Sequence, residues 1–94
     1  MNYLIILNSL YPDHLDEVNK TIENYDHAIR INQSTWLINT KYEAVIIRQH
    51  LVNVMSIHDS LLIFKINHEF SIANHLDVSD WLEDMQHHNL VSIS

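Results

Sequence analysis

The sequence predicts an α+β domain in which two helices cover one face of a four-stranded sheet. Segments 2–7 and 60–66 are apolar at consecutive positions, as in strands that are covered on both faces. Segments 12–25 and 41–55 instead carry apolar residues at helical spacing. Between these two helices the chain alternates with the period of two that is typical of strands.

The first strand is expected at Asn2–Leu7. Tyr11-Pro12-Asp13 then opens a helix, because proline is tolerated in a first helical turn and acidic residues complement the helix dipole there. An apolar stripe at helical spacing follows, made of Leu15, Val18, Ile22 and Tyr25. We expect this helix to end near Tyr25.

A hairpin is expected next. His27–Ile31 alternates, and the polar pair Asn32-Gln33 can turn the chain into a second strand within Ser34–Thr40. In that strand Trp36 and Ile38 fall on one face, and Thr35, Leu37 and Asn39 fall on the other. Thr40 followed three residues later by Glu43 has the spacing of a capping box, so we expect a helix to begin at Thr40.

The second helix should run from Lys41 to about Met55, and Ser60–Ile66 should be the fourth strand. The broad apolar side of this helix comprises Ala44, Ile47, Leu51, Val54 and Met55, with Val45 and Val52 beside them. The resulting order is strand, helix, strand, strand, helix, strand, which is the βαββαβ arrangement of the ferredoxin-like fold. We expect one such domain over residues 1–94, with its core at 2–66 and a C-terminal extension at 67–94.

Two helices on one face leave the other face of the sheet bare. Because the first and fourth strands are apolar on both faces, we expect a second copy of the chain to cover this open face in a homodimer. In the extension, Asp77 or Ser79 can cap a short helix from Asp80 to His87. Leu90–Ile93 has the pattern of a fifth strand, at an edge of its own sheet or of the partner's.

Composition excludes several kinds of site. The chain has 5 basic and 12 acidic residues, a net charge of −7, no cysteine and no glycine. It therefore has no disulfide, no thiolate metal site and no glycine-rich phosphate loop. The N-terminus lacks a basic leader, and no apolar run approaches the ~20 residues of a membrane span. We expect a cytoplasmic protein that does not enter a membrane.

Four short segments resemble a known family. They are Tyr3-Leu4-Ile5, Ser34–Ile38, Asp59–Ile63 and Trp81-Leu82, and they are similar to the small CRISPR-associated protein 2 family and its stand-alone relatives labelled SinR family. The resemblance implies a ferredoxin-like homodimer whose sheets pack face to face. Some members of the family are metal-dependent nucleases, and others are structural parts of a DNA-integration complex.

The same resemblance bears on catalysis. Nuclease members carry an aspartate at the end of the first strand, where the two copies meet and hold a divalent metal. The matching residue here is Asn8. An amide oxygen brings no negative charge, so Mg²⁺ would be held weakly and would activate water poorly. Ser9, His14 and Asp13 are the residue types of a nucleophilic triad, but these residue types also occur together by chance in polar loops.

Charged residues supply the remaining candidate sites. Two acidic groups are expected on helices, Asp77, Asp80, Glu83 and Asp84 near the C-terminus and Asp13, Asp16 and Glu17 at the first helix. They are either solvated helix faces or, if a dimer merges them, a surface that mimics a phosphate backbone. The candidates for phosphate contacts are Arg30, Lys41, Arg48 and Lys65.

These observations favour a non-catalytic homodimeric interaction module without a cofactor. Its partner would be a protein, for example a nucleic-acid-binding one, and its role that of an inhibitor or adaptor in antiviral defence carried by a phage or mobile element. A metal-dependent endonuclease using Mg²⁺ through Asn8 is one alternative. A nucleic-acid-binding scaffold is the other, although the net charge of −7 disfavours it.

Overall fold

The computed structural model describes residues 1–67 and 69–93, with side chains left out at residues 12 and 86–93. Its strands are β1 (Asn2–Asn8), β2 (His27–Asn32), β3 (Thr35–Asn39) and β4 (Ser60–Ile66). Its helices are the 3₁₀ turn η1 (Pro12–His14) and the α-helices α1 (Leu15–Glu23), α2 (Ala44–Val52) and α3 (Leu76–Ile93).

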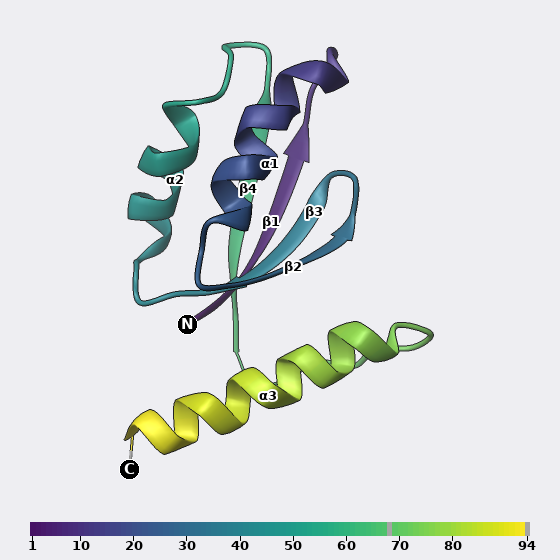
Figure 1. The fold of residues 1–94 in the computed structure, drawn as a ribbon, viewed down its shortest axis with the longest axis vertical. Helices are drawn as coiled ribbons and strands as arrows, with labels where there is room; N and C mark the ends of the chain where they lie inside the picture. The colour runs from purple at the N-terminus through teal and green to yellow at the C-terminus, as the bar shows by residue number, and fades with distance from the viewer. Residues whose placement is uncertain (68, 94) are drawn as a thin grey trace.

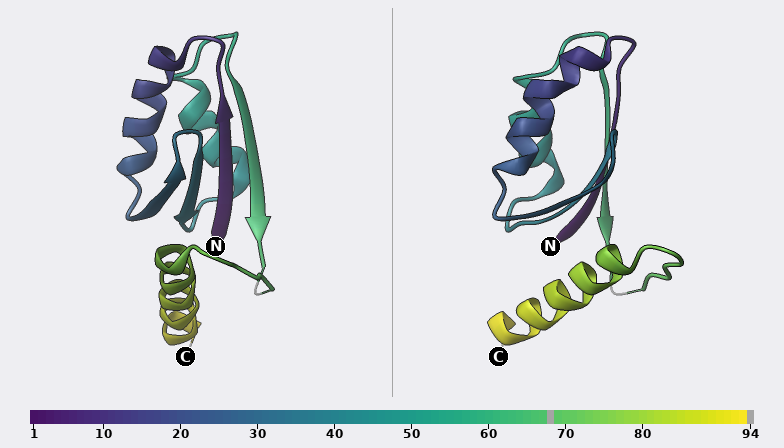
Figure 2. Two further views of the ribbon diagram at one scale, coloured as in Figure 1. Left: turned by 90° about the vertical axis from the view of Figure 1, so that its right-hand side faces the viewer. Right: turned by 45° about the vertical axis from the view of Figure 1, so that its right-hand side comes forward.

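The four strands form one antiparallel sheet in the order β2-β3-β1-β4. β1 and β3 are therefore central, and β2 and β4 are the edges. Both α1 and α2 lie on the same face of this sheet, and α3 lies across its lower end (Figure 1; Figure 2). The predicted α+β class and the ferredoxin-like order of elements are confirmed.

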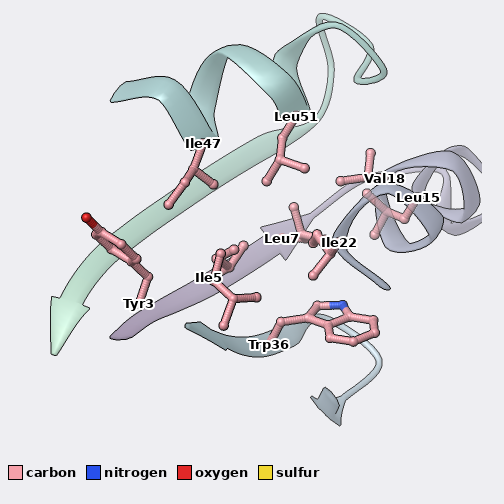
Figure 3. Close-up of a cluster of buried hydrophobic side chains, with 10 residues drawn as sticks. Tyr3, Ile5, Leu7, Leu15, Val18, Ile22, Trp36, Ile47 and Leu51 are labelled. Carbon is pink, nitrogen blue, oxygen red and sulfur yellow. The ribbon is translucent and has the colours of Figure 1, made fainter. Parts of the chain in front are cut away.

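The main core lies between the sheet and the helices α1 and α2. Alternate residues of β1, namely Tyr3, Ile5 and Leu7, are almost fully buried and face the helices (Figure 3). They meet Leu15, Val18 and Ile22 from α1, Ile47 and Leu51 from α2, and Trp36 and Ile38 from β3. This is the alternation that the sequence predicts for the strand at Trp36.

Trp36 is fixed by polar contacts as well as by packing. Its indole Nε1 donates a hydrogen bond of 2.9 Å to Oδ1 of the buried Asn19. The Arg30 guanidinium lies 5.5 Å from the centre of the indole ring. A buried indole N–H needs such an acceptor, and the side chain of Asn19 provides it from α1.

The predicted start of the second helix is wrong. α2 begins at Ala44, and its N-cap residue, Glu43, makes no side-chain capping bond. Instead of capping the helix, the hydroxyl of Thr40 accepts the N–H of Tyr42 at 3.3 Å. Thr40 also pairs with the chain start, because its N–H donates to the Met1 carbonyl at 2.9 Å and its carbonyl accepts from the Met1 ammonium at 2.8 Å. This pairing keeps Thr40 extended, so the helix starts later.

The C-terminal prediction also needs correction. A single helix, α3, takes the residues assigned to a short helix at 80–87 and to a fifth strand at 90–93. Among the α3 side chains that the structure describes, the buried apolar ones are Val78, Leu82 and Met85, which recur at helical spacing. The chain has no glycine, and its one proline is Pro12, so no helix breaker interrupts this pattern. Ser94 lies outside the described residues.

Candidate interaction surface

The face of the sheet opposite α1 and α2 is apolar along its two central strands and β4. The register pairs Leu4 with Phe64 and Ile6 with Leu62 across β1 and β4, and pairs Leu4 with Leu37 across β1 and β3. Because paired residues point to the same side of a sheet, these side chains share one face. We call this the open face.

Part of the open face is covered by the chain itself. Val78 and Leu82 of α3 pack on Leu37, which is only 3% exposed. Half-buried apolar residues surround this contact, namely Leu4, Ile29, Ile31, Ile66, Phe70, Ile72 and Trp81. The extension therefore covers the open face around Leu37, including Leu4 of β1 and Ile66 of β4, although the sequence assigned this face to a partner copy.

The rest of the β1–β4 part of the open face, around Ile6, Leu62 and Phe64, remains uncovered. Leu62 is 51% exposed and Phe64 is 52% exposed, and Ile6 beside them is half-buried. Apolar side chains gathered in this way are typical of a surface that binds another protein.

The end of β1 has the wrong chemistry for a magnesium centre. Asn8 is exposed and pairs with Ser60 at the start of β4. The adjacent carboxylate is that of Asp59, just before β4, and its Oδ2 accepts the Ser56 N–H at 2.9 Å. Among the residues that the structure describes, no three His, Cys, Asp or Glu side chains gather as a metal site would require. One neutral amide and one carboxylate, whose Oδ2 already accepts the Ser56 N–H, make a poor site for Mg²⁺.

Asp59 acts as a local turn residue in this arrangement. The Ser9 hydroxyl and the Ser56 N–H lower the pKa of the Asp59 carboxyl, and His14 contributes a smaller effect in the same direction. The Ser9 hydroxyl proton has two acceptors in reach, the Asp59 carboxylate, whose pKa it lowers, and the Tyr11 carbonyl at 3.1 Å. The carboxylate therefore joins the ends of β1 and β4 electrostatically.

Ser9 and His14 do not form the hydrogen-bonded pair of a nucleophilic triad. The Ser9 hydroxyl accepts the N–H of Tyr11 at 3.1 Å in addition to donating to its carbonyl. The His14 ring lies against the Tyr11 ring, with their centres 5.2 Å apart. Both groups that would have to form the nucleophile pair are thus engaged with Tyr11 instead of with each other.

The two acidic groups lie at opposite ends of the chain. All seven side chains are exposed, namely Asp13, Asp16 and Glu17 at η1 and α1, and Asp77, Asp80, Glu83 and Asp84 on α3. η1 and the first turn of α1 are at the top of Figure 1, whereas α3 is at the bottom. A single chain therefore does not merge them into one negative surface.

The four candidate cations come from four different parts of the fold. Arg30 lies on β2, Lys41 precedes α2, Arg48 is on α2 and Lys65 is on β4, and all are exposed. Arg30 is also held by its own hairpin, because its guanidinium donates to the carbonyls of Asn32 at 3.1 Å and Gln33 at 2.8 Å. This distribution differs from the single basic stripe that tracks a nucleic-acid backbone.

A solved structure gives an independent view of this geometry. The chain is similar to the crystal structure of Streptococcus pyogenes Cas2 determined at pH 6.5, with a TM-score of 0.60 and 18% sequence identity. The match covers 78% of this chain and 100% of the Cas2 chain. The chain has a Cas2-like fold. No protein-family model matches the sequence, and no curated protein matches it significantly. Among the described residues, no helix has the length and apolar character needed to cross a bilayer.

The sequence indicated an apolar open face but did not single out Leu62 and Phe64 within it. In this structure, the register of β4 against β1 places both residues on the open face. Their alternation within Ser60–Ile66 was a usable signal. The part of the face that the extension covers could not be read from the sequence, because it depends on where α3 docks.

Proposed function

We propose that this protein is a non-catalytic homodimeric interaction module with a Cas2-like fold, which binds a protein partner. The observation that carries the proposal is the uncovered part of the open face, where Leu62 and Phe64 are half exposed on a regular strand. The setting that we propose is antiviral defence, with the protein acting as an inhibitor or adaptor carried by a phage or mobile element.

The dimer is proposed to form around a two-fold axis through β1 and β4. A two-fold interface brings the same patch of both copies together, so each Phe64 would meet apolar groups of the other chain. Stable interfaces bury roughly 800 Å² per partner, more than Leu62 and Phe64 alone supply. Ile6, which is half-buried and pairs with Leu62, adds apolar surface on the same face.

The protein partner is proposed to have a basic surface. The chain carries a net charge of −7, and its acidic side chains on α3 and at the start of α1 are exposed. Such charges accelerate association with a positively charged partner and disfavour direct binding to nucleic acid. A nucleic-acid-binding protein has the complementary charge.

Catalysis is not part of the proposal. Asn8 stands where the family resemblance places the metal-binding aspartate, and Asp59 is engaged with the Ser56 N–H. Asn8 brings no charge to a divalent cation, and the single charge of Asp59 is shared with the Ser56 N–H, so the pair would activate water poorly.

Two measurements test the proposal in sequence. Light scattering coupled to size-exclusion chromatography should give the mass of a dimer at micromolar concentration, and a monomer at all concentrations would contradict the dimer. Tagged protein should then capture a stoichiometric protein from host or infected cells with and without nuclease treatment, and the purified pair should re-form. Recovery of nucleic acid, together with loss of the captured partner proteins after nuclease digestion, would favour the nucleic-acid-binding scaffold instead.

A charge-matched pair of variants locates the partner surface. Asp80→Asn, Glu83→Gln and Asp84→Asn together remove three charges from α3. Glu23→Gln, Asp26→Asn and Glu69→Gln together remove three exposed charges elsewhere. If α3 carries the contact, the first variant should slow association strongly and the second only slightly. Equal effects would mean that net charge alone attracts the partner.

A further inference from the structure

A cavity lies at the end of the sheet opposite Asn8. Its volume is about 580 Å³, and it is bordered by the last turn of α1, the first residue of β2, the last residue of β3 and the loop that leads into α2. The register pairs Asn39 in its wall with Asn2, at the start of β1, whereas Asn8 is at the end of that strand. The cavity is therefore separate from the uncovered β1–β4 surface, and ligand binding in it is independent of the proposed function.

Three aromatic rings form one side of this cavity. The Tyr25 hydroxyl and His50 Nδ1 are 2.9 Å apart. The rings of Tyr42 and His50 have centres 5.2 Å apart at 89°, and those of Tyr25 and Tyr42 are 6.5 Å apart at 85°. These near-perpendicular arrangements are favourable ones for aromatic groups. We call Tyr25, Tyr42 and His50 the aromatic wall.

The aromatic wall is anchored to the core, and a hydrogen bond joins two of its members. The buried Tyr3 donates its hydroxyl to the Tyr42 carbonyl at 3.0 Å, which fixes the loop before α2. Burial, with a smaller effect from Tyr42, raises the pKa of the Tyr25 phenol. The phenol therefore stays protonated at neutral pH, and it either donates to His50 Nδ1 or accepts from it, according to the tautomer of the imidazole ring.

The charge of the cavity wall differs from that of the whole chain. Lys41 and the histidines His27 and His50 line it, against one carboxylate, Asp26. The complete sequence instead has more than twice as many acidic as basic residues. An anion in this cavity would meet one cation, Lys41, and several hydrogen-bonding side chains, although the molecule as a whole is negative.

We propose that this cavity binds a mononucleotide, with the base against the aromatic wall and the phosphate near Lys41. Base–aromatic stacking tolerates any base, because every base has a π face. The volume falls within the range of roughly 300–1,000 Å³ for small-molecule sites and is suited to one nucleotide, not to a duplex. A simple carboxylate or phosphate would use Lys41 but leave the three rings without a stacking partner.

The test is a titration of ¹⁵N-labelled full-length protein with AMP, GMP, CMP and UMP at low ionic strength, followed by amide chemical shifts. Saturable shifts are expected at Tyr25, Lys41, Tyr42 and His50. Ribose 5-phosphate and inorganic phosphate should bind at least about tenfold more weakly, because they lack a base. Equal binding of ribose 5-phosphate, or no saturation with any nucleotide at about 5 mM, would overturn the proposal.

Matched variants separate this site from general charge effects. Tyr42→Leu should weaken nucleotide binding about tenfold, and Lys41→Gln about threefold with a weaker salt dependence. Tyr42 is half exposed, so the variant is expected to fold, and the dispersion of its amide spectrum checks this. The controls are Tyr11→Leu, another exposed tyrosine, and Arg48→Gln, another exposed cation, and neither should change affinity more than about twofold. If the controls weaken binding as much as the two test variants, the site is not this cavity.

Discussion

Phe64→Ser tests the proposed dimer at the residue where the structure predicts the largest effect. Phe64 is 52% exposed in the single chain. A phenylalanine side chain can bury roughly 200 Å², so about 100 Å² remains for an interface, which is worth about 2.5 kcal/mol at ~25 cal/mol per Å². A two-fold dimer contains this contact twice, so the total loss is about 5 kcal/mol. The dimer dissociation constant should therefore rise by about three to four orders of magnitude.

Sedimentation equilibrium of wild-type protein and Phe64→Ser over a wide concentration range measures this change. Val45→Ser is the matched control, because Val45 is 48% exposed but lies on α2, away from the open face. Circular dichroism of each variant checks that the fold is intact. A Phe64→Ser dissociation constant within about tenfold of wild type would refute the assignment of β1 and β4 to the interface.

Three further predictions concern the core, the turn at Asp59 and the end of β1. Trp36→Ala should lower the free energy of unfolding by about 3–5 kcal/mol, and Trp36→Phe by about 1–3 kcal/mol because Asn19 loses its donor; urea denaturation measures both. The pKa of Asp59 is lowered from 3.8, so its carboxylate stabilises the fold fully above that value, and this contribution is lost as the pH falls through the lower pKa of the folded state. The difference in melting temperature between wild type and Asp59→Asn should therefore be constant near neutral pH and shrink in strong acid, and an unchanged difference there would contradict this. Asn8→Asp should create Mg²⁺- or Mn²⁺-dependent cleavage of RNA or DNA if the missing charge is the only defect, whereas wild-type protein should show none; activity in the wild type would instead support the nuclease alternative.

The sheet and its two covering helices were predictable because each element has its own pattern. The alternation around Trp36, the stripe through Val18 and Ile22, and the apolar run in Ser60–Ile66 all indicate the observed structure. These patterns arise from burial against neighbours in one layered core, so local spacing is enough to read them. The order of the elements then restricts the topology to very few arrangements.

The predicted boundaries of helices are wrong where contacts between residues distant in sequence compete with local sequence patterns. Thr40 and Glu43 have the spacing of a capping box, yet Thr40 pairs with Met1, which is 39 positions away. Residues 90–93 are suited to a strand, but they continue a helix whose buried side is set by Val78 and Leu82 packing on Leu37. The local sequence indicates neither of these contacts.

The candidate sites were less predictable than the fold for the same reason. Acidic residues on helices are easy to find, but the sequence gives no sign that they lie at opposite ends of one chain. The aromatic wall joins residues from the turn after α1, the loop before α2 and α2 itself, and no spacing along the chain links Tyr25 with Tyr42 and His50. Such a site becomes visible only when the packing of the two helices is known.

The position of α3 determines which assembly the open face can form. Leu37 is already covered by Val78 and Leu82 of α3. The sheet of a partner copy therefore cannot pack over all four strands unless α3 is displaced. Displacement would expose this second core cluster, and the loss of its apolar burial would oppose the dimer. A dimer that keeps α3 in place must instead be offset toward β1 and β4, the strands that carry Leu62 and Phe64. An offset of this kind leaves α3 outside the interface, where its acidic residues remain available to a third protein.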